Sequence, residues 1–99
     1  MVDVRQTTIF REWLDGLADR RAATRIAQRI VRLQAGLAGD AKPVGGGVSE
    51  LRVDYGPGYR VYFVRRGQVL IILLCGGDKR SQRRDIARAK TLAAELEVE

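Results

Sequence analysis

Residues 50–63, ELRVDYGPGYRVYF, constrain the fold of this chain more than any other segment. Apolar and polar residues alternate on both sides of Gly56-Pro57-Gly58, which is typical of two strands joined by a turn. Each predicted strand carries one arginine, Arg52 or Arg60, and side chains of neighbouring strands can meet across a sheet. Two guanidinium groups held side by side match the oxygens of a phosphate. The segment therefore predicts a strand pair with a candidate anion site on one face.

The spacing of apolar residues predicts helices before this strand pair and one helix after it. We expect helices over residues 9–17, 20–35 and 82–95, and strands over residues 2–5, 49–55, 59–65 and 69–74. Residues 36–47 are rich in glycine and predict a flexible connector, and Gly76-Gly77 is expected to end the last strand. The element order β-α-α-β-β-β-α predicts an α+β fold in two layers, with helices packed on a small, mostly antiparallel sheet.

The length of 99 residues suits one hydrophobic core, so we expect residues 1–99 to form a single domain. The most apolar run, residues 69–75, is far too short to cross a bilayer, and no membrane partner is expected. Residues 1–8 lack the apolar core of a signal peptide, which favours a cytoplasmic location.

The chain contains no histidine and a single cysteine, Cys75. This composition excludes a Ser-His-Asp triad, a histidine general base and a zinc site built from histidines or thiolates. We therefore expect neither a metal nor another cofactor. Cys75 ends an apolar run and is expected to be a buried, unreactive thiol.

Positive charge is concentrated in the second half of the chain. Residues 52–90 contain 10 Lys/Arg and 3 Asp/Glu, a net charge of +7, whereas the whole chain carries +6. Arg80, Arg83 and Arg84 lie at the start of the last predicted helix, where cations oppose the helix dipole and weaken the helix slightly. We predict that these arginines bind RNA, or an acidic protein that neutralises them.

A second group of arginines lies on the helix predicted over residues 20–35. Arg21, Arg25, Arg29 and Arg32 follow one another along one side of it. Contact with nucleic acid is one interpretation of this row, and a solvated helix face is the favoured one.

RNA can be cleaved without a metal or a histidine, because the ribose 2′-hydroxyl can attack the adjacent phosphorus. Holding the backbone in line lowers the barrier, and cations stabilise the extra charge of the pentacovalent phosphate. Lys79 is a candidate base, because neighbouring arginines favour the uncharged form of a lysine. Glu50 is another candidate base, although a solvated or arginine-paired carboxylate is the favoured interpretation of this residue.

Tyr62 is a candidate for stacking on a nucleobase beside Arg60, whereas Tyr59 is expected to pack in the core.

Four motifs in order make the chain resemble the RelE/ParE superfamily of bacterial toxins, and most of all its HigB-like branch of addiction-module killer proteins. They are F..WL..L at 10–17, GD.K.VG.GV at 39–48, ELR.DYGPGYRVYF at 50–63 and LL.GGDK..Q..DI..A at 73–89. The resemblance implies a small sheet flanked by helices. It also implies the toxin of a type II toxin–antitoxin module, a metal-independent mRNA endoribonuclease that inhibits translation, often on the ribosome. The implied partner is an antitoxin of the helix-turn-helix type.

The resemblance also implies roles for single residues. Arg60 matches the phosphate-stabilising arginine, Arg52 a basic position on the preceding strand, and Lys79 and Arg80 the basic residues after the last strand. Many ribosome-dependent members carry a tyrosine or histidine near the final helix, where this chain reads SQRRDIARAK at 81–90. A ParE-like DNA gyrase inhibitor and a basic binding domain without toxic activity therefore stay as alternatives.

Overall fold

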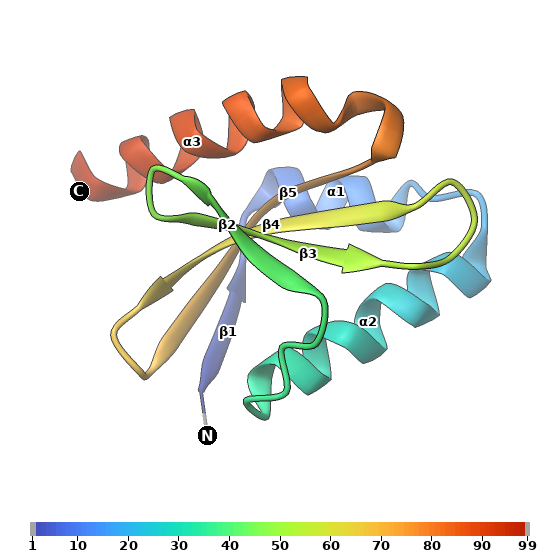
Figure 1. The fold of residues 1–99 in the computed structure, drawn as a ribbon, viewed down its shortest axis with the longest axis horizontal. Coiled ribbons are helices and arrows are strands. Elements are labelled where there is room, and N and C mark those ends of the chain that lie inside the picture. The colour runs from blue at the N-terminus through green and yellow to red at the C-terminus, as the bar shows by residue number, and fades with distance from the viewer. Residues whose placement is uncertain (1, 99) are drawn as a thin grey trace.

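The computed structural model describes residues 2–98 (Figure 1). One strand and two helices are followed by four consecutive strands, and a short 3-10 helix, η1, precedes the last α-helix. The elements are β1 (Asp3–Gln6), α1 (Thr8–Asp15), α2 (Arg20–Gln34), β2 (Ala41–Gly45), β3 (Val48–Val53), β4 (Tyr59–Arg66), β5 (Leu70–Asp78), η1 (Lys79–Ser81) and α3 (Gln82–Val98).

The strands form one mixed sheet in the order β1-β5-β4-β3-β2. β1 runs parallel to β5, and the other neighbouring pairs are antiparallel. The pair predicted from residues 50–63 is β3 and β4, whose register sets Arg52 opposite Arg60. The expected α+β architecture with a mostly antiparallel sheet is therefore confirmed.

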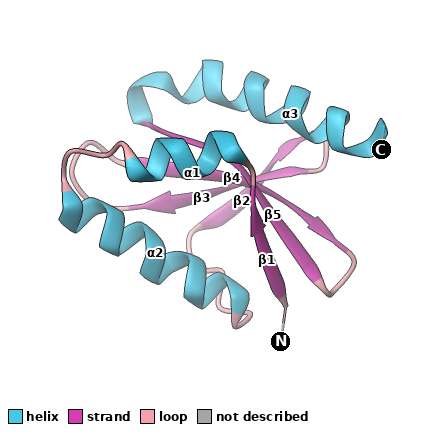
Figure 2. Cartoon of the chain, turned by 180° about the vertical axis from the view of Figure 1, so that it is seen from behind, coloured by secondary structure: helices cyan, strands magenta, loops and turns pink. Residues whose placement is uncertain are grey.

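Helices cover both faces of this sheet, so the structure has three layers where the sequence predicted two (Figure 2). Phe10 of α1 and Ile26 and Leu33 of α2 pack on the face that includes the buried strand residues Leu51 and Val61. On the opposite face, α3 packs its small residues Ala89 and Ala93 against strand residues that include Tyr62, Val64 and Leu74. Every second residue of β3 and β4 thus faces α3, and both Arg52 and Arg60 belong to that set.

The sequence predicted that the glycine-rich segment 36–47 is a flexible connector, but part of it forms a strand. Residues Ala41–Gly45 form β2, which pairs with β3 at the edge of the sheet. An edge strand needs little apolar alternation, and it tolerates Pro43 because no further strand pairs beyond it. Gly45, Gly46 and Gly47 all have positive φ and make the turn into β3.

The prediction that Gly76-Gly77 ends the last strand is wrong, because β5 continues to Asp78. Both glycines are needed for close approach of neighbouring side chains. A Cβ on Gly76 would lie 2.3 Å from the Trp13 ring, and one on Gly77 would lie 1.8 Å from Asp85 Oδ2. These glycines let α1 and the start of α3 pack directly on β5.

The predicted helix starts are confirmed by their side-chain caps. Thr7 accepts a hydrogen bond from Phe10 N at 3.0 Å, and Asp19 accepts one from Arg21 N at 3.0 Å. Asp78 accepts a hydrogen bond from Arg80 N at 2.8 Å at the start of η1.

Within residues 2–98, no helix combines the length and apolarity that a membrane span requires.

Candidate functional site

A cleft of about 270 Å³ lies where β3, β4 and η1 meet. Its lining residues, here called the basic cleft, are Asp40, Arg52, Asp54, Gly58, Arg60 and Lys79. The three residues predicted as catalytic, Arg52, Arg60 and Lys79, are thus brought together from three different elements. Gly58 lies next to two of them: a Cβ there would be in ordinary contact with Lys79 Cβ at 3.6 Å and with Arg60 Nη1 at 3.8 Å. Its φ of +83° is the feature that favours glycine.

Glu50 is fully buried beside this cleft, and its carboxylate contacts side chains from β3, β4 and α3. Arg52 Nε donates to Glu50 Oε1 at 3.0 Å. Tyr62 Oη and Gln82 Nε2 donate to Glu50 Oε2 at 3.2 Å and 2.8 Å. Of the two interpretations of Glu50, the arginine-paired carboxylate is the observed one, and the solvated carboxylate is wrong. In the sequence, Glu50 alternates with Arg52 and Asp54 on the polar side of the strand, a pattern that gave no signal for such burial.

The hydrogen bonds keep the Glu50 carboxylate charged. Burial alone would raise the pKa of Glu50, but donors from Arg52, Gln82 and Tyr62 and the charge of Arg60 outweigh it and lower that pKa. Burial, followed by the charge of Glu50, raises the pKa of Tyr62 well above its ordinary value. Tyr62 therefore remains a phenol that donates to a carboxylate.

The prediction that the Tyr62 ring stacks on a nucleobase does not fit this structure. The ring is fully buried under α3, because β4 turns it to the same face as Glu50 and Val64. Tyr59 lies on the other face and packs on the core beside Trp13, with ring centroids 6.2 Å apart, as expected.

Arg60 is also more enclosed than the sequence suggested, with 8% of its surface exposed. Its Nε lies 3.9 Å from Glu50 Oε1, and this buried atom has no hydrogen-bond partner among residues 2–98. The charge of Glu50 therefore stabilises Arg60 from the inner side. The Nη1 atom points toward Gly58 and the basic cleft.

Two carboxylates that sequence reasoning had not singled out, Asp40 and Asp54, also line the basic cleft. Asp40 is held in place because Arg52 N donates to its carbonyl oxygen at 2.9 Å, and its charge contributes to a raised pKa of Arg52 after the larger effect of Glu50. Asp54 follows β3 directly and is exposed, with no ion pair to any side chain of the described range. Together with Glu50, these residues balance the three cations of the cleft.

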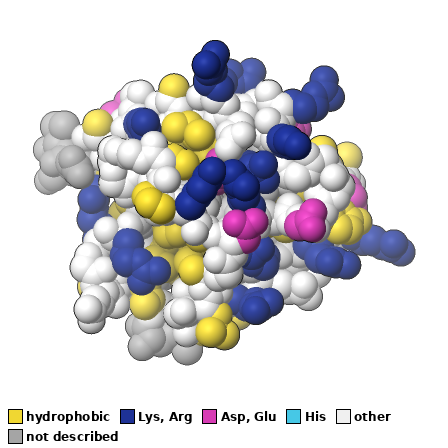
Figure 3. All heavy atoms as spheres, viewed as in Figure 1, with side chains coloured by type: hydrophobic (Ala, Val, Ile, Leu, Met, Phe, Trp, Pro, Cys, Tyr) yellow, Lys and Arg dark blue, Asp and Glu magenta, His cyan; other side chains and the backbone are white. Residues whose placement is uncertain are grey.

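Arg80, Arg83 and Arg84 surround a second cleft at the start of α3, of about 560 Å³, together with Asp78 and Ser81. Lys79 and Arg80 were expected at one site, but they line different clefts. Arg84 is largely exposed, and its Nε lies 3.9 Å from Asp85 Oδ1. Figure 3 shows Lys and Arg side chains gathered between α3 above and α2 below, with acidic side chains next to them.

Cys75 is the buried thiol that the sequence predicted. It is 1% exposed, and burial, with a smaller effect of Asp85, raises its pKa to about 11. No cluster of three or more His, Cys, Asp or Glu residues that could hold a metal ion occurs in the described part of the chain.

Comparisons with known proteins agree with this architecture. The family model "Phage derived protein Gp49-like (DUF891)" matches residues 12–97. An uncharacterized protein of Haemophilus influenzae is 50% identical over 95 residues, which cover 96% of each chain. Among solved structures, a chain of the toxin–antitoxin complex RelBE2 from Mycobacterium tuberculosis aligns with a TM-score of 0.65 at 20% identity, over 79% of this chain and 98% of that one. The expected RelE-like fold is therefore confirmed.

Proposed function

We propose that this chain, which belongs to the Phage derived protein Gp49-like family, is the toxin of a toxin–antitoxin module and cleaves messenger RNA without a metal ion. The fold it shares with a chain of RelBE2 supports the first part of the proposal. A HigB-like position within the superfamily, suggested by the sequence motifs, belongs to the same proposal.

The convergence of Arg52, Arg60 and Lys79 on one cleft carries the proposal. Arg52 and Arg60 lie on the paired strands β3 and β4, and Lys79 joins them from the start of η1. Arg60 is fixed from within by Glu50, so its guanidinium is oriented before a ligand arrives. Cations placed in advance around a phosphate stabilise the charge that develops on its oxygens as the 2′-oxygen attacks.

The proposed reaction is an internal transesterification. The 2′-oxygen forms a bond to phosphorus while the bond to the 5′-oxygen breaks, which leaves a 2′,3′-cyclic phosphate and a 5′-hydroxyl. Arg52 and Arg60 hold the phosphate oxygens, and Lys79 donates a hydrogen bond or a proton to the leaving 5′-oxygen. Lys79 as the base, the role considered from sequence alone, is the alternative assignment.

Asp54 is our candidate for the base that accepts the 2′-hydroxyl proton. The other two carboxylates are engaged: Glu50 by its four neighbours, and Asp40 by its proximity to Arg52. Asp54 lines the same cleft, is exposed, and carries no ion pair to a described side chain. The residues of α3 include no tyrosine or histidine that could accept a proton. The Asp54 carboxylate would take this role.

Purified protein and synthetic RNA test the reaction. Wild type in EDTA is incubated with a 20-nucleotide RNA, with the same strand carrying 2′-O-methyl groups throughout, and with a translation mixture containing ribosomes. We expect cyclic-phosphate ends from unmodified RNA, free or ribosome-bound, and none from the methylated strand. Arg60→Ala should abolish the products, and Arg5→Ala, on the exposed edge strand β1, should not. Cleavage of the methylated strand, or no cleavage of any RNA, would overturn the proposal.

A non-catalytic toxin that inhibits DNA gyrase is a second candidate. Two observations favour a toxin without RNA cleavage: Arg60 is largely buried, and three carboxylates balance the three cations at the cleft. Loss of gyrase supercoiling on addition of the purified protein, without any RNA cleavage, would select this candidate.

The proposed partner is an antitoxin that covers or blocks the basic surface. Residues 52–90 carry a net charge of +7, which would otherwise recruit RNA without control. A helix-turn-helix protein, as the sequence resemblance implies, is the form of antitoxin we expect. Growth arrest on induction of the chain alone, relieved by the neighbouring gene of its operon, is the expected genetic behaviour.

A further inference from the structure

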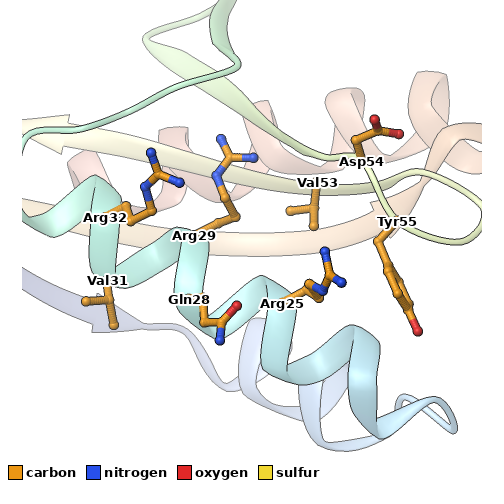
Figure 4. A pocket seen from close by; sticks show the side chains of 8 residues that line it. All are labelled: Arg25, Gln28, Arg29, Val31, Arg32, Val53, Asp54 and Tyr55. Carbon is orange, nitrogen blue, oxygen red and sulfur yellow. The ribbon is translucent and has the colours of Figure 1, made fainter.

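A groove of about 600 Å³ lies between α2 and the end of β3, outside the basic cleft (Figure 4). α2 lines it with Arg25, Arg29, Val31 and Arg32, and the opposite wall is formed by Val53 and Tyr55. Arg25, Arg29 and Arg32 are part of the arginine row for which the sequence favoured a solvated face. Figure 4 shows their side chains reaching from α2 toward the segment that includes Val53, Asp54 and Tyr55.

The three arginines differ in how much of their hydrogen-bonding capacity the protein already uses. Arg29 donates from Nη1 to the carbonyl oxygen of Arg52 at 2.5 Å and from Nη2 to that of Ala38 at 3.0 Å. Arg25 lies 5.1 Å above the centre of the Tyr55 ring. Arg32 is exposed and pairs with no acidic side chain of the described range. Arg29 therefore builds the groove, while Arg25 and Arg32 can bind a ligand.

The groove also exposes apolar surface next to these cations. Val31 lines the groove and is 63% exposed, and Leu37, whose N donates to the carbonyl oxygen of Arg32 at 2.8 Å, is 59% exposed just outside it. Few large apolar residues of the described chain are this exposed, and two of them lie at or near the groove. A ligand that fits both features carries negative charge beside apolar side chains.

We propose that this groove binds an acidic, amphipathic segment of a partner protein. Charge complementarity supports this occupant, because Arg25 and Arg32 offer two guanidiniums that carboxylates can pair with. RNA fits less well. Arg25 already covers a face of the Tyr55 ring on which a base would stack, and the exposed Val31 offers an apolar contact that a phosphate backbone does not use.

The helix geometry sets the spacing of the partner's charges. Arg32 follows Arg25 by seven positions, so their α-carbons are about 10 Å apart along α2. Two acidic side chains seven residues apart on a helix match this distance and share one face, whereas two residues three apart on an extended strand point to opposite faces. An apolar residue between them would contact Val31 or Val53.

Occupancy of the groove has a consequence for the basic cleft. Asp54 lines both, and Arg29 binds the backbone of Arg52. A partner in the groove would therefore sit at the rim of the cleft and hinder access to it. This consequence rests on the proposed function, whereas binding of the acidic segment does not.

A display library of random 12-residue peptides, selected against the full-length protein, tests the inference. Enriched peptides are then measured by fluorescence anisotropy on wild type, on Arg25→Glu/Arg32→Glu, and on the control Arg5→Glu/Arg65→Glu. The control makes the same charge change at exposed positions of β1 and β4. Circular dichroism checks that all three proteins are folded, which is expected because the changed side chains are exposed.

We expect enriched peptides to contain paired Asp or Glu residues with an intervening apolar residue. Their affinity should fall at least tenfold on Arg25→Glu/Arg32→Glu and less than twofold on the control, and it should weaken as NaCl rises. Failure to enrich acidic peptides, or equal binding to all three proteins, would overturn the inference. So would a larger loss of affinity for a 12-nucleotide poly(U) RNA than for the peptides on Arg25→Glu/Arg32→Glu, because the groove would then bind RNA. RNA cleavage is not measured in this experiment, so its outcome is independent of the proposed reaction.

Discussion

The Glu50 carboxylate supports the basic cleft from inside the protein. It is fully buried and accepts hydrogen bonds from Arg52, Tyr62 and Gln82, while Arg60 Nε lies 3.9 Å away. Removing one partner of such a buried group leaves the others unsatisfied. Glu50 thus orients two predicted phosphate ligands without touching the substrate.

Glu50→Gln should destabilise the protein by roughly 1.5–3 kcal/mol, the usual range for hydrogen bonds to a charged group. Urea unfolding of wild type and variant measures this, and Ser49→Ala on the same strand is the control. A loss below about 0.5 kcal/mol, the level of an ordinary surface change, would show that the network contributes nothing.

The lowered pKa of Glu50 also predicts how stability depends on pH. The folded state binds fewer protons than the unfolded chain, so stability rises with pH over this titration. The contribution of Glu50 is complete above its ordinary value of 4.5 and is lost as the pH falls through the lower folded value. Between pH 6 and 2, the stability of Glu50→Gln should therefore fall less steeply than that of wild type. Parallel curves would contradict this.

Asp54→Asn separates the role of base from that of a simple charge. Removal of a negative charge from the cleft should leave RNA binding equal or stronger. Loss of a general base should nevertheless lower kcat by about 10²–10⁴-fold. Asp40→Asn is the matched control and should keep kcat within about tenfold of wild type, because a neighbouring charge contributes less than a proton acceptor. An active Asp54→Asn enzyme would return the role of base to Lys79.

At the scale of elements, sequence reasoning succeeded where the periodicity of apolar residues is clear. The β3–β4 pair and the helical register of α2 both follow from such local patterns. β2 was missed because an edge strand with glycine and proline lacks those patterns. The end of β5 was misplaced because the glycines were interpreted as strand breakers. Glycine occurs at position 76 because the Trp13 ring lies against it, and this contact between distant residues leaves no local pattern.

Gly76→Ala tests whether contact with Trp13 requires glycine in β5. In a strand with free space, alanine is expected to stabilise by about 0.4–1 kcal/mol relative to glycine. Here the added methyl would collide with the Trp13 ring, so a loss of about 1–3 kcal/mol is expected. In thermal unfolding, the Trp13→Ala background should reduce or reverse the effect of Gly76→Ala. The same loss in both backgrounds would refute the steric explanation.

The start of α3 is the element that we expect to bind RNA outside the basic cleft. Arg83 and Arg84 are exposed and line the cleft at its N-terminus. Arg83→Gln/Arg84→Gln should weaken RNA binding and reduce the slope of log K against log salt by about 0.7 for each phosphate that the protein no longer neutralises. Arg5→Gln/Arg65→Gln removes equal charge elsewhere and should keep more of the slope. Equal slopes for the two variants would place the RNA on another surface.

At the scale of the whole molecule, the total charge could be read from the sequence, but its distribution over the surface could not. The +7 of residues 52–90 suggested one basic site. Folding instead brings Asp40, Asp54 and Glu50 to the cations of the basic cleft and leaves Arg80, Arg83 and Arg84 at a separate one. Alternation correctly predicted that Arg52 and Arg60 share a face. The burial of Tyr62 depends on α3 packing over it, which no local pattern shows.

Mapping of transcript ends in growing cells tests the central claim most directly. Wild type, Arg60→Ala and the control Arg5→Ala are induced to equal protein levels, and new 5′-hydroxyl ends are sequenced. We predict growth arrest with new ends inside messenger RNAs for wild type and Arg5→Ala, and neither effect for Arg60→Ala. Growth arrest by Arg60→Ala equal to that by wild type, with no new messenger RNA ends in either, would contradict the account.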